Sequence, residues 1–183
     1  VNIDSLETIR IEGEYLDTTK ASMRQDFINA GRTFVENGEN ASNGQNICGY
    51  NPGSVFEVPI STDKEATIVI IARMAHSDSE YDIRDGFVFK VDDQVLTPDE
   101  VHFEMRHGND YWNWKEFRVG VASIQPGDHT FSLEVKNGHP NMDCFDFMVT
   151  QYGDEKADKT VTNLNLVSGP TKTKYEIGEK FDP

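Results

Sequence analysis

Short segments in which apolar and polar residues alternate recur along most of the chain. Phe131, Leu133 and Val135 alternate with polar residues, and such a period of two places one strand face in a core and the other in water. Strand-length segments also occur at 7–16, 46–60, 66–75, 86–96, 101–107, 114–124 and 141–152, with Gly, Pro, Asn or Asp at the turns. This pattern predicts an all-β fold, an antiparallel β-sandwich of the jelly-roll type.

Two segments have distinct local signals. Residues 86–96 predict a hairpin with Asp92 and Asp93 at its tip, and the polar stretch 19–44 predicts a loop with room for a helical turn. The longest apolar run, residues 66–75, contains Arg73 and is shorter than the roughly 18 residues that span a bilayer. We therefore interpret it as a buried strand and expect no membrane insertion.

The charge balance narrows the choice of partner. The chain has 32 acidic and 17 basic residues and a formal net charge of −15. Phosphate backbones and anionic membranes require basic surfaces, so the sequence argues against both, nucleic acid above all. Abundant carboxylates suit a hard cation such as Ca²⁺, although acidity also serves solubility alone.

The composition changes after the last predicted strand. Residues 1–153 predict one domain of ordinary size, and the charged stretch 154–160 is typical of a linker. Residues 161–183 contain too few apolar residues to fold alone. The chain therefore has the character of a fragment of a larger protein.

Two carboxylates near the start pose a chemical question. Glu12 and Glu14 would lie on the same strand face, and like charges repel there unless something holds them. A solvated surface, a metal site and a glycosidase-type carboxyl pair all remain open. Asp143 lies in the last predicted strand, which a jelly roll brings close to the first, so it can join the pair. Three carboxylates without a basic partner favour a cation.

Other chemical signals are weak. Cys48 and Cys144 can pair or remain free, and no CxxC or Cys/His cluster predicts zinc. There is no GxSxG or HExxH motif, and none of the five histidines forms an i,i+4 pair. We therefore expect a protein that is not an enzyme.

Four stretches together resemble carbohydrate-binding modules of families 6 and 35. They are "IRIEGEYLD", "ASNGQNICGYNPGSVFEVPI", "YWNWKEFRVGVASIQPGDHTFSLEV" and "NMDCFDFMV", in the family's order over residues 7–152. The resemblance implies a jelly roll that binds sugars without cleaving them and carries a structural calcium ion. The chain departs from the family at Cys144, where an aromatic residue is usual, and in the length of the 18–44 loop.

The same resemblance implies a set of calcium ligands. Glu12, Glu14 and Asp143 correspond to the side-chain ligands of the family, and an oxygen at Ser42 or Asn43 would complete the site. A calcium ion would then explain how the paired carboxylates are held together.

Aromatic residues suggest where a sugar could stack. Tyr111 and Trp112 lie near a turn and are expected to be exposed, whereas Trp114 leads into a strand and is expected in the core. Tyr50 is either a second aromatic wall or a buried strand residue.

Polar residues before the last strand suggest hydroxyl recognition. The family places a ligand-binding Asn here, so Asn137 or Asn141 is expected in that role, with His139 between them. The sugar itself is not specified. The negative charge disfavours uronates at long range, although Arg106 or Arg118 could offset it locally.

The tail has a resemblance of its own. "SGPTKTKYEIGEKFDP" (168–183) resembles the start of a bacterial Ig-like repeat of Gram-positive surface proteins. It implies a module linked covalently to others in a secreted or wall-attached protein, and we expect the module to be a monomer. A protein-binding adhesin, a spacer or, less favoured, a jelly-roll glycan-cleaving domain are the alternatives.

Overall fold

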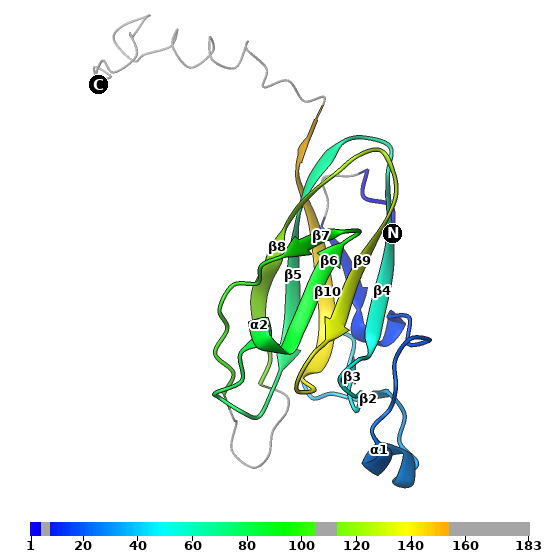
Figure 1. Cartoon of the computed structure of the whole chain (residues 1–183), viewed down its shortest axis with the longest axis vertical. Coiled ribbons are helices and arrows are strands. Elements are labelled where there is room, and N and C mark those ends of the chain that lie inside the picture. Colours follow the sequence, from blue (N-terminus) through cyan, green and yellow to red (C-terminus); the bar gives the residue numbers. More distant parts are fainter. Residues whose placement is uncertain (5–7, 105–112, 154–183) are drawn as a thin grey trace, which may run out of the picture.

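Two antiparallel β-sheets pack face to face in the computed structural model, which describes residues 1–4, 8–104 and 113–153 (Figure 1). Within these residues, one sheet has the order β2-β3-β10-β5-β8, with β1 also paired to β10, and the other has the order β4-β9-β6-β7. The first sheet comprises β1 (Ile9–Glu12), β2 (Val35–Asn37), β3 (Gln45–Ile47), β5 (Ala66–Ala75), β8 (Lys115–Ile124) and β10 (Asn141–Tyr152). The second comprises β4 (Val55–Thr62), β6 (Phe87–Val91), β7 (Gln94–Leu96) and β9 (Gly127–Val135). The predicted all-β sandwich is confirmed.

Helical turns occupy the connections. They are the 3₁₀ turn η1 (Gly13–Tyr15), α1 (Gln25–Asn29) and α2 (Ile83–Gly86). The predicted hairpin is present as β6 and β7, and Asp92 takes a left-handed conformation (φ 50°) at its tip. None of the helices in the described ranges has the length and apolar character that crossing a bilayer requires.

One predicted strand is wrong in its described part. Residues 101–104 form no strand, and residues 105–107 lie outside the described ranges. Only Phe103 of this part is buried, against the rings of His76 and Tyr81 at centroid distances of 6.1 and 6.0 Å. One buried aromatic residue in an irregular segment was therefore mistaken for part of a strand.

The core lies between the inner faces of the two sheets. Alternate residues of β5, β9 and β10 point into it, as the period of two requires. Phe131 of β9 packs on Phe145 and Phe147 of β10 at centroid distances of 5.6 and 5.4 Å. Each such ring contributes on the order of 2 kcal/mol or more by leaving water, so this contact ties the two sheets together.

The first residues of β10 are the meeting point of several segments. Asn141 pairs with Ala75 of β5, Met142 with Ile47 of β3, and Cys144 with Glu12 of β1. Because β10 is irregular between Met142 and Cys144, its side chains here depart from strict alternation. Two groups of polar residues involve this part of β10, one at Asp143 and Cys144 and one at Asn141. The proposed linker and Ig-like start, residues 154–183, lie outside the described residues.

Candidate functional site

An acidic cluster forms where β1 ends beside β10. Glu12 is the last residue of β1, and one ligand-type atom from each of Glu12, Asp143 and Cys144 lies within 4.8 Å of the other two. The predicted approach of the first and last strands is therefore observed.

Glu14 lies in a different element from the one predicted. It lies in the turn η1 and not in a strand, so the same-face argument for Glu12 and Glu14 is wrong. Gly13 explains the turn: a Cβ there would collide with the Met142 carbonyl oxygen and come within 2.9 Å of that of Asp143. The absence of a side chain lets η1 lie directly on β10.

The loop before β3 supplies polar groups to all three carboxylates. The backbone N–H of Ser42 donates to Asp143 Oδ1 at 2.8 Å, and its hydroxyl contacts both Asp143 and Glu12. The Asn43 amide donates to Glu14 Oε1 at 2.7 Å. The other Glu14 oxygen, Oε2, is buried and has no hydrogen-bond partner among the described residues. Ser42 thus contacts two of the carboxylates predicted to hold calcium, Glu12 and Asp143, and Asn43 contacts the third, Glu14.

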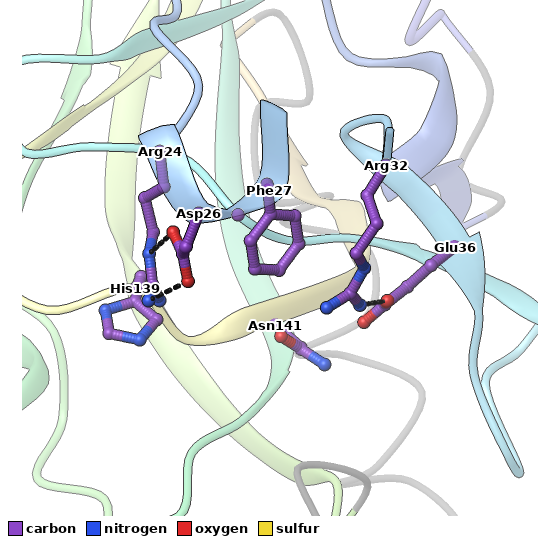
Figure 2. A pocket seen from close by; sticks show the side chains of 8 residues that line it. Arg24, Asp26, Phe27, Arg32, Glu36, His139 and Asn141 are labelled. Carbon is purple, nitrogen blue, oxygen red and sulfur yellow. Dashed lines mark hydrogen bonds and ion pairs between the residues drawn. The ribbon is translucent and has the colours of Figure 1, made fainter. Parts of the chain in front are cut away.

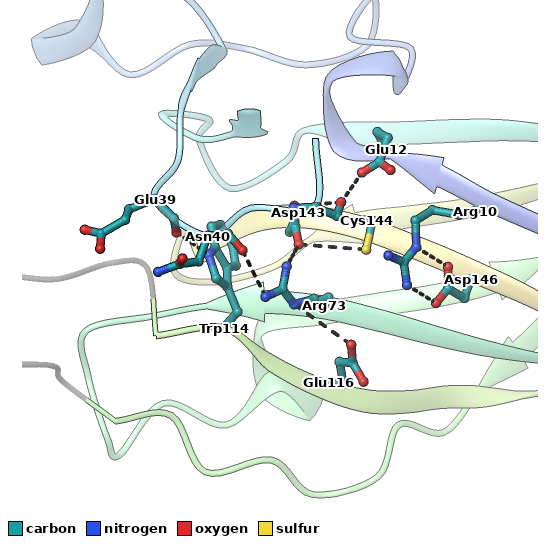
Figure 3. A network of polar contacts seen from close by, with 11 residues as sticks. Arg10, Glu12, Glu39, Asn40, Arg73, Trp114, Glu116, Asp143, Cys144 and Asp146 are labelled. Carbon is teal, nitrogen blue, oxygen red and sulfur yellow. Dashed lines mark hydrogen bonds and ion pairs between the residues drawn. The ribbon is translucent and has the colours of Figure 1, made fainter. Parts of the chain in front are cut away.

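A basic partner that the sequence reasoning excluded lies on the neighbouring strand. The guanidinium of Arg73 in β5 contacts Asp143, whose side chain is 0% exposed (Figure 3). It also donates to the Asn40 carbonyl oxygen at 3.0 Å and lies 5.5 Å from the Trp114 ring. The assumption that the three carboxylates have no basic partner is wrong. The sequence motifs do not show which residue of β5 lies beside Asp143 and Cys144 of β10.

Trp114 is also placed differently from the prediction. It is half-buried beside this cluster and not in the core, and its indole N–H donates to the Glu39 carbonyl oxygen at 2.9 Å. Trp114 and Arg73 thus both donate hydrogen bonds to carbonyl oxygens of the 38–43 loop.

The neighbouring charges are already paired. Arg10 donates two hydrogen bonds to Asp146, of 2.7 and 2.6 Å, and this raises the pKa of the guanidinium. Burial raises the pKa of the Cys144 thiol to about 12, so it stays protonated at neutral pH. Cys48 is also buried, and both cysteines are free.

A separate pocket lies between α1 and the start of β10 (Figure 2). Its volume is about 250 Å³, and two predicted sugar-binding residues, His139 and Asn141, line it. The remaining lining residues are Arg24, Asp26, Phe27, Arg32, Glu36 and Gly49.

Phe27 organises the wall of the pocket. Its ring packs against Gly49, where a Cβ would collide with it and where φ is +70°. The guanidinium carbons of Arg32 and Arg24 lie 3.9 and 5.4 Å from the ring centroid. This packing fixes α1 over the start of β10.

Each arginine of the pocket has a carboxylate partner. Arg24 bonds Asp26 through two nitrogens at 3.1 and 2.7 Å, and Arg32 contacts Glu36. The pocket therefore offers alternating donors and acceptors while its formal charges cancel. Polar groups placed in this way fix the orientation of a ligand in a pocket.

The other predicted sugar contacts have different outcomes. Tyr50 is 0% exposed, packs on Phe56 and bonds the Pro140 carbonyl oxygen, so its role as an exposed aromatic wall is wrong. Asn137 is exposed, but it does not line the pocket. Tyr111 and Trp112 lie outside the described residues, as does Arg106. Arg118 pairs with Asp99 at 2.6 Å.

The sequence reasoning missed the residues of the long loop. Arg24, Phe27 and Arg32 were grouped into a polar connection, although one aromatic and two arginines within nine positions are an unusual content for a spacer. That composition could have indicated that the loop contributes to a binding site.

Comparison with known proteins gives a consistent fold. No family model and no curated protein sequence matches the chain. In contrast, its structure is similar to the C-terminal family 6 carbohydrate-binding module of a laminarinase from Zobellia galactanivorans: 20% identity, 78% of this chain, 99% of that one, TM-score 0.51. A family 35 module from Clostridium thermocellum matches with 13% identity, 77% and 97% coverage and a TM-score of 0.54.

Two further solved structures extend this pattern. A β-1,3-glucan-binding family 6 module from Bacillus halodurans shows 21% identity, 76% and 95% coverage and a TM-score of 0.51. A Podospora anserina β-(1,4)-mannanase with a family 35 module shows 15% identity and a TM-score of 0.55. The match covers 80% of this chain and 28% of the mannanase chain. The chain therefore has the β-sandwich fold of family 6 and family 35 carbohydrate-binding modules.

Proposed function

We propose that the chain is a non-catalytic carbohydrate-binding module whose sugar site is the pocket under α1. The observation that carries this proposal is that His139 and Asn141, selected from the sequence for hydroxyl recognition, line a pocket together with two arginine–carboxylate pairs. The fold shared with isolated carbohydrate-binding modules supports it.

The charges of the pocket favour a neutral glycan. Arg24 and Arg32 are compensated by Asp26 and Glu36, and the whole chain carries a net charge of −15. A uronate would have to displace a carboxylate from its guanidinium and approach a strongly negative protein. A neutral sugar hydroxyl can instead accept from the guanidinium and donate to the carboxylate without separating them.

The pocket alone predicts modest affinity. A small, open site with few contacts must offset the cost of ordering both partners, so Kd should lie at roughly 10 µM to 1 mM. Because two of the matched modules come from a laminarinase or bind β-1,3-glucan, β-1,3-gluco-oligosaccharides are the first probe, with galacturonic acid oligomers as the charged comparison.

We further propose a structural calcium ion at Glu12, Glu14, Asp143, Ser42 and Asn43. Carboxylate, hydroxyl and amide oxygens are the ligands that Ca²⁺ selects, and the buried Glu14 Oε2, which has no hydrogen-bond partner among the described residues, could coordinate the ion. Calcium would supply positive charge there. The chain's own residues tie the 38–43 loop to the β1–β10 edge, with Ser42 and Asn43 contacting the carboxylates directly.

A catalytic use of the same carboxylates is disfavoured by their surroundings. Asp143 is fully buried and paired with Arg73, and Glu12 and Glu14 face Ser42 and Asn43 of the loop. None of the three lines the pocket. Release of product from glycans, abolished by Glu12→Gln in a folded protein, would overturn the non-catalytic assignment.

The test of the sugar site is a comparison of binding and stability. Asn141→Ala should lose binding of β-1,3-gluco-oligosaccharide in isothermal titration calorimetry. The matched control is Asn137→Ala, an exposed Asn of the same turn that does not line the pocket, which should bind as the parent does. Equal binding by all three proteins would refute the pocket as the site.

The context of the module is part of the proposal. We propose that it is a monomeric unit of an extracellular glycan-active protein, linked covalently to neighbouring modules. The matched mannanase, in which a family 35 module occurs within a longer enzyme chain, supports this arrangement.

A further inference from the structure

We propose that Arg73 is a built-in counter-charge that sets the acidic cluster to accept a divalent cation. This inference rests on the proposed calcium site. It concerns the guanidinium itself, which is not a ligand but lies against one: Arg73 contacts the carboxylate of Asp143, the most deeply buried of the three carboxylates.

The position of the Arg73 charge is fixed by its contacts. Its strand partners are Cys144 on β10 and Glu116 on β8, so the side chain starts on a strand that is paired on both sides. Contact with Asp143, a 3.0 Å hydrogen bond to the Asn40 carbonyl oxygen and the Trp114 ring at 5.5 Å then hold the guanidinium from different sides. Its side chain is only 22% exposed. An arginine stays charged at any relevant pH, so this positive charge is permanent.

The formal charges then match a divalent ion. Glu12, Glu14 and Asp143 contribute three negative charges and Arg73 one positive charge, which leaves −2. Other nearby charges change this little. Arg10 is paired with Asp146, and Glu116 lies 3.9 Å from Arg73 with a side chain that is 63% exposed to screening solvent.

Charge and packing make different predictions for a variant. Repulsion between Arg73 and a bound ion grows in proportion to the charge of the ion. Removing the guanidinium therefore favours a trivalent ion more than a divalent one. If Arg73 only shaped the 38–43 loop, its loss would weaken the binding of both ions equally. The ratio of the two affinities separates these cases.

The experiment compares Ca²⁺ with Tb³⁺ at one fixed ionic strength. Both ions are titrated by calorimetry into the parent, Arg73→Gln, Arg73→Lys and the control Arg118→Gln, which removes an arginine of β8 whose partner is Asp99. We expect the preference for Tb³⁺ over Ca²⁺ to rise about tenfold in Arg73→Gln, which corresponds to about 1.4 kcal/mol. Arg73→Lys and Arg118→Gln should keep the ratio of the parent.

Each outcome decides the proposal. An unchanged ratio in a folded Arg73→Gln protein overturns the counter-charge role and leaves the calcium site standing. Failure of the parent to bind either ion overturns both. Should Arg73→Gln not fold, judged by circular dichroism, Arg73→Met, whose unbranched chain retains packing against Trp114, is titrated in its place. The same tenfold shift is then required.

Discussion

Removing the proposed calcium ion should lower the melting temperature of the domain. The carboxylates of Glu12, Glu14 and Asp143 converge on a loop that approaches through Ser42 and Asn43. With the ion absent, the net charge of −2 that remains beside Arg73 is uncompensated. An ion that binds only the folded state at 100 times its Kd adds about 2.7 kcal/mol. At roughly 2–4 °C per kcal/mol for a domain of this size, melting should fall by about 5–10 °C.

The assay is differential scanning calorimetry with EDTA, with excess Ca²⁺ and with excess Mg²⁺. Ca²⁺ should restore the melting temperature and Mg²⁺ should restore less, because Mg²⁺ requires a tighter octahedral site. Glu12→Gln should remove most of the response. Its matched control is Glu134→Gln, a carboxylate paired with Lys136 on the other sheet. Identical melting curves in EDTA and Ca²⁺ would show that no structural ion is bound.

Three further changes test the surroundings of the two sites. Tyr50→Phe removes a buried hydroxyl that donates to the Pro140 carbonyl oxygen. The free energy of unfolding in urea should fall by about 1 kcal/mol, while the sugar affinity measured by calorimetry stays unchanged. A large loss of affinity would show that Tyr50 contributes to sugar binding. Gly13→Ala places a Cβ within 2.9 Å of the Asp143 carbonyl oxygen and should cost about 1–3 kcal/mol together with part of the calcium response, whereas a stability equal to the parent would refute the close approach. Burial lowers the pKa of His76 and His139 below the ordinary value of 6.5. The unfolded chain therefore binds more protons than the folded protein just below pH 6.5. The free energy of unfolding should fall as the pH drops through that region, by up to about 1.4 kcal/mol per pH unit for each group. His139→Gln should flatten this dependence below about pH 6.5, and an unchanged slope there would contradict the assignment.

The parts of the fold predicted from sequence are those governed by local patterns. The segment that became β9 alternates because one face packs in the core, and that period of two is visible without knowing the partner strand. The segment that became β5 was recognisable instead as the longest apolar run of the chain. Residues 101–104 show the limit of this reasoning, since Phe103 is buried alone.

The errors at the sites have non-local causes. The turn at Glu14 depends on Gly13 meeting carbonyl oxygens of β10, and the partner of Asp143 depends on Arg73 lying one strand away. Neither relation is encoded in a motif. Tyr50 is buried, which was one of the two alternatives, and Trp114 is half-buried and not in the core, because burial of an aromatic residue is decided by which sheet face it meets. The resemblance to carbohydrate-binding modules supplied the five residues of the proposed calcium site, but it gave no indication of the pocket wall built by Phe27 and the two arginines.

The most direct test of the account is an NMR titration of ¹⁵N-labelled protein with a neutral β-1,3-gluco-oligosaccharide. The account predicts saturable shifts confined to the pocket, in the amides of residues 24–36, 49 and 139–141, with a Kd of roughly 10 µM to 1 mM, and no comparable shifts with galacturonate oligomers. Shifts that saturate elsewhere, on the outer face of either sheet for example, or stronger binding of the galacturonate, would contradict a neutral-sugar site under α1.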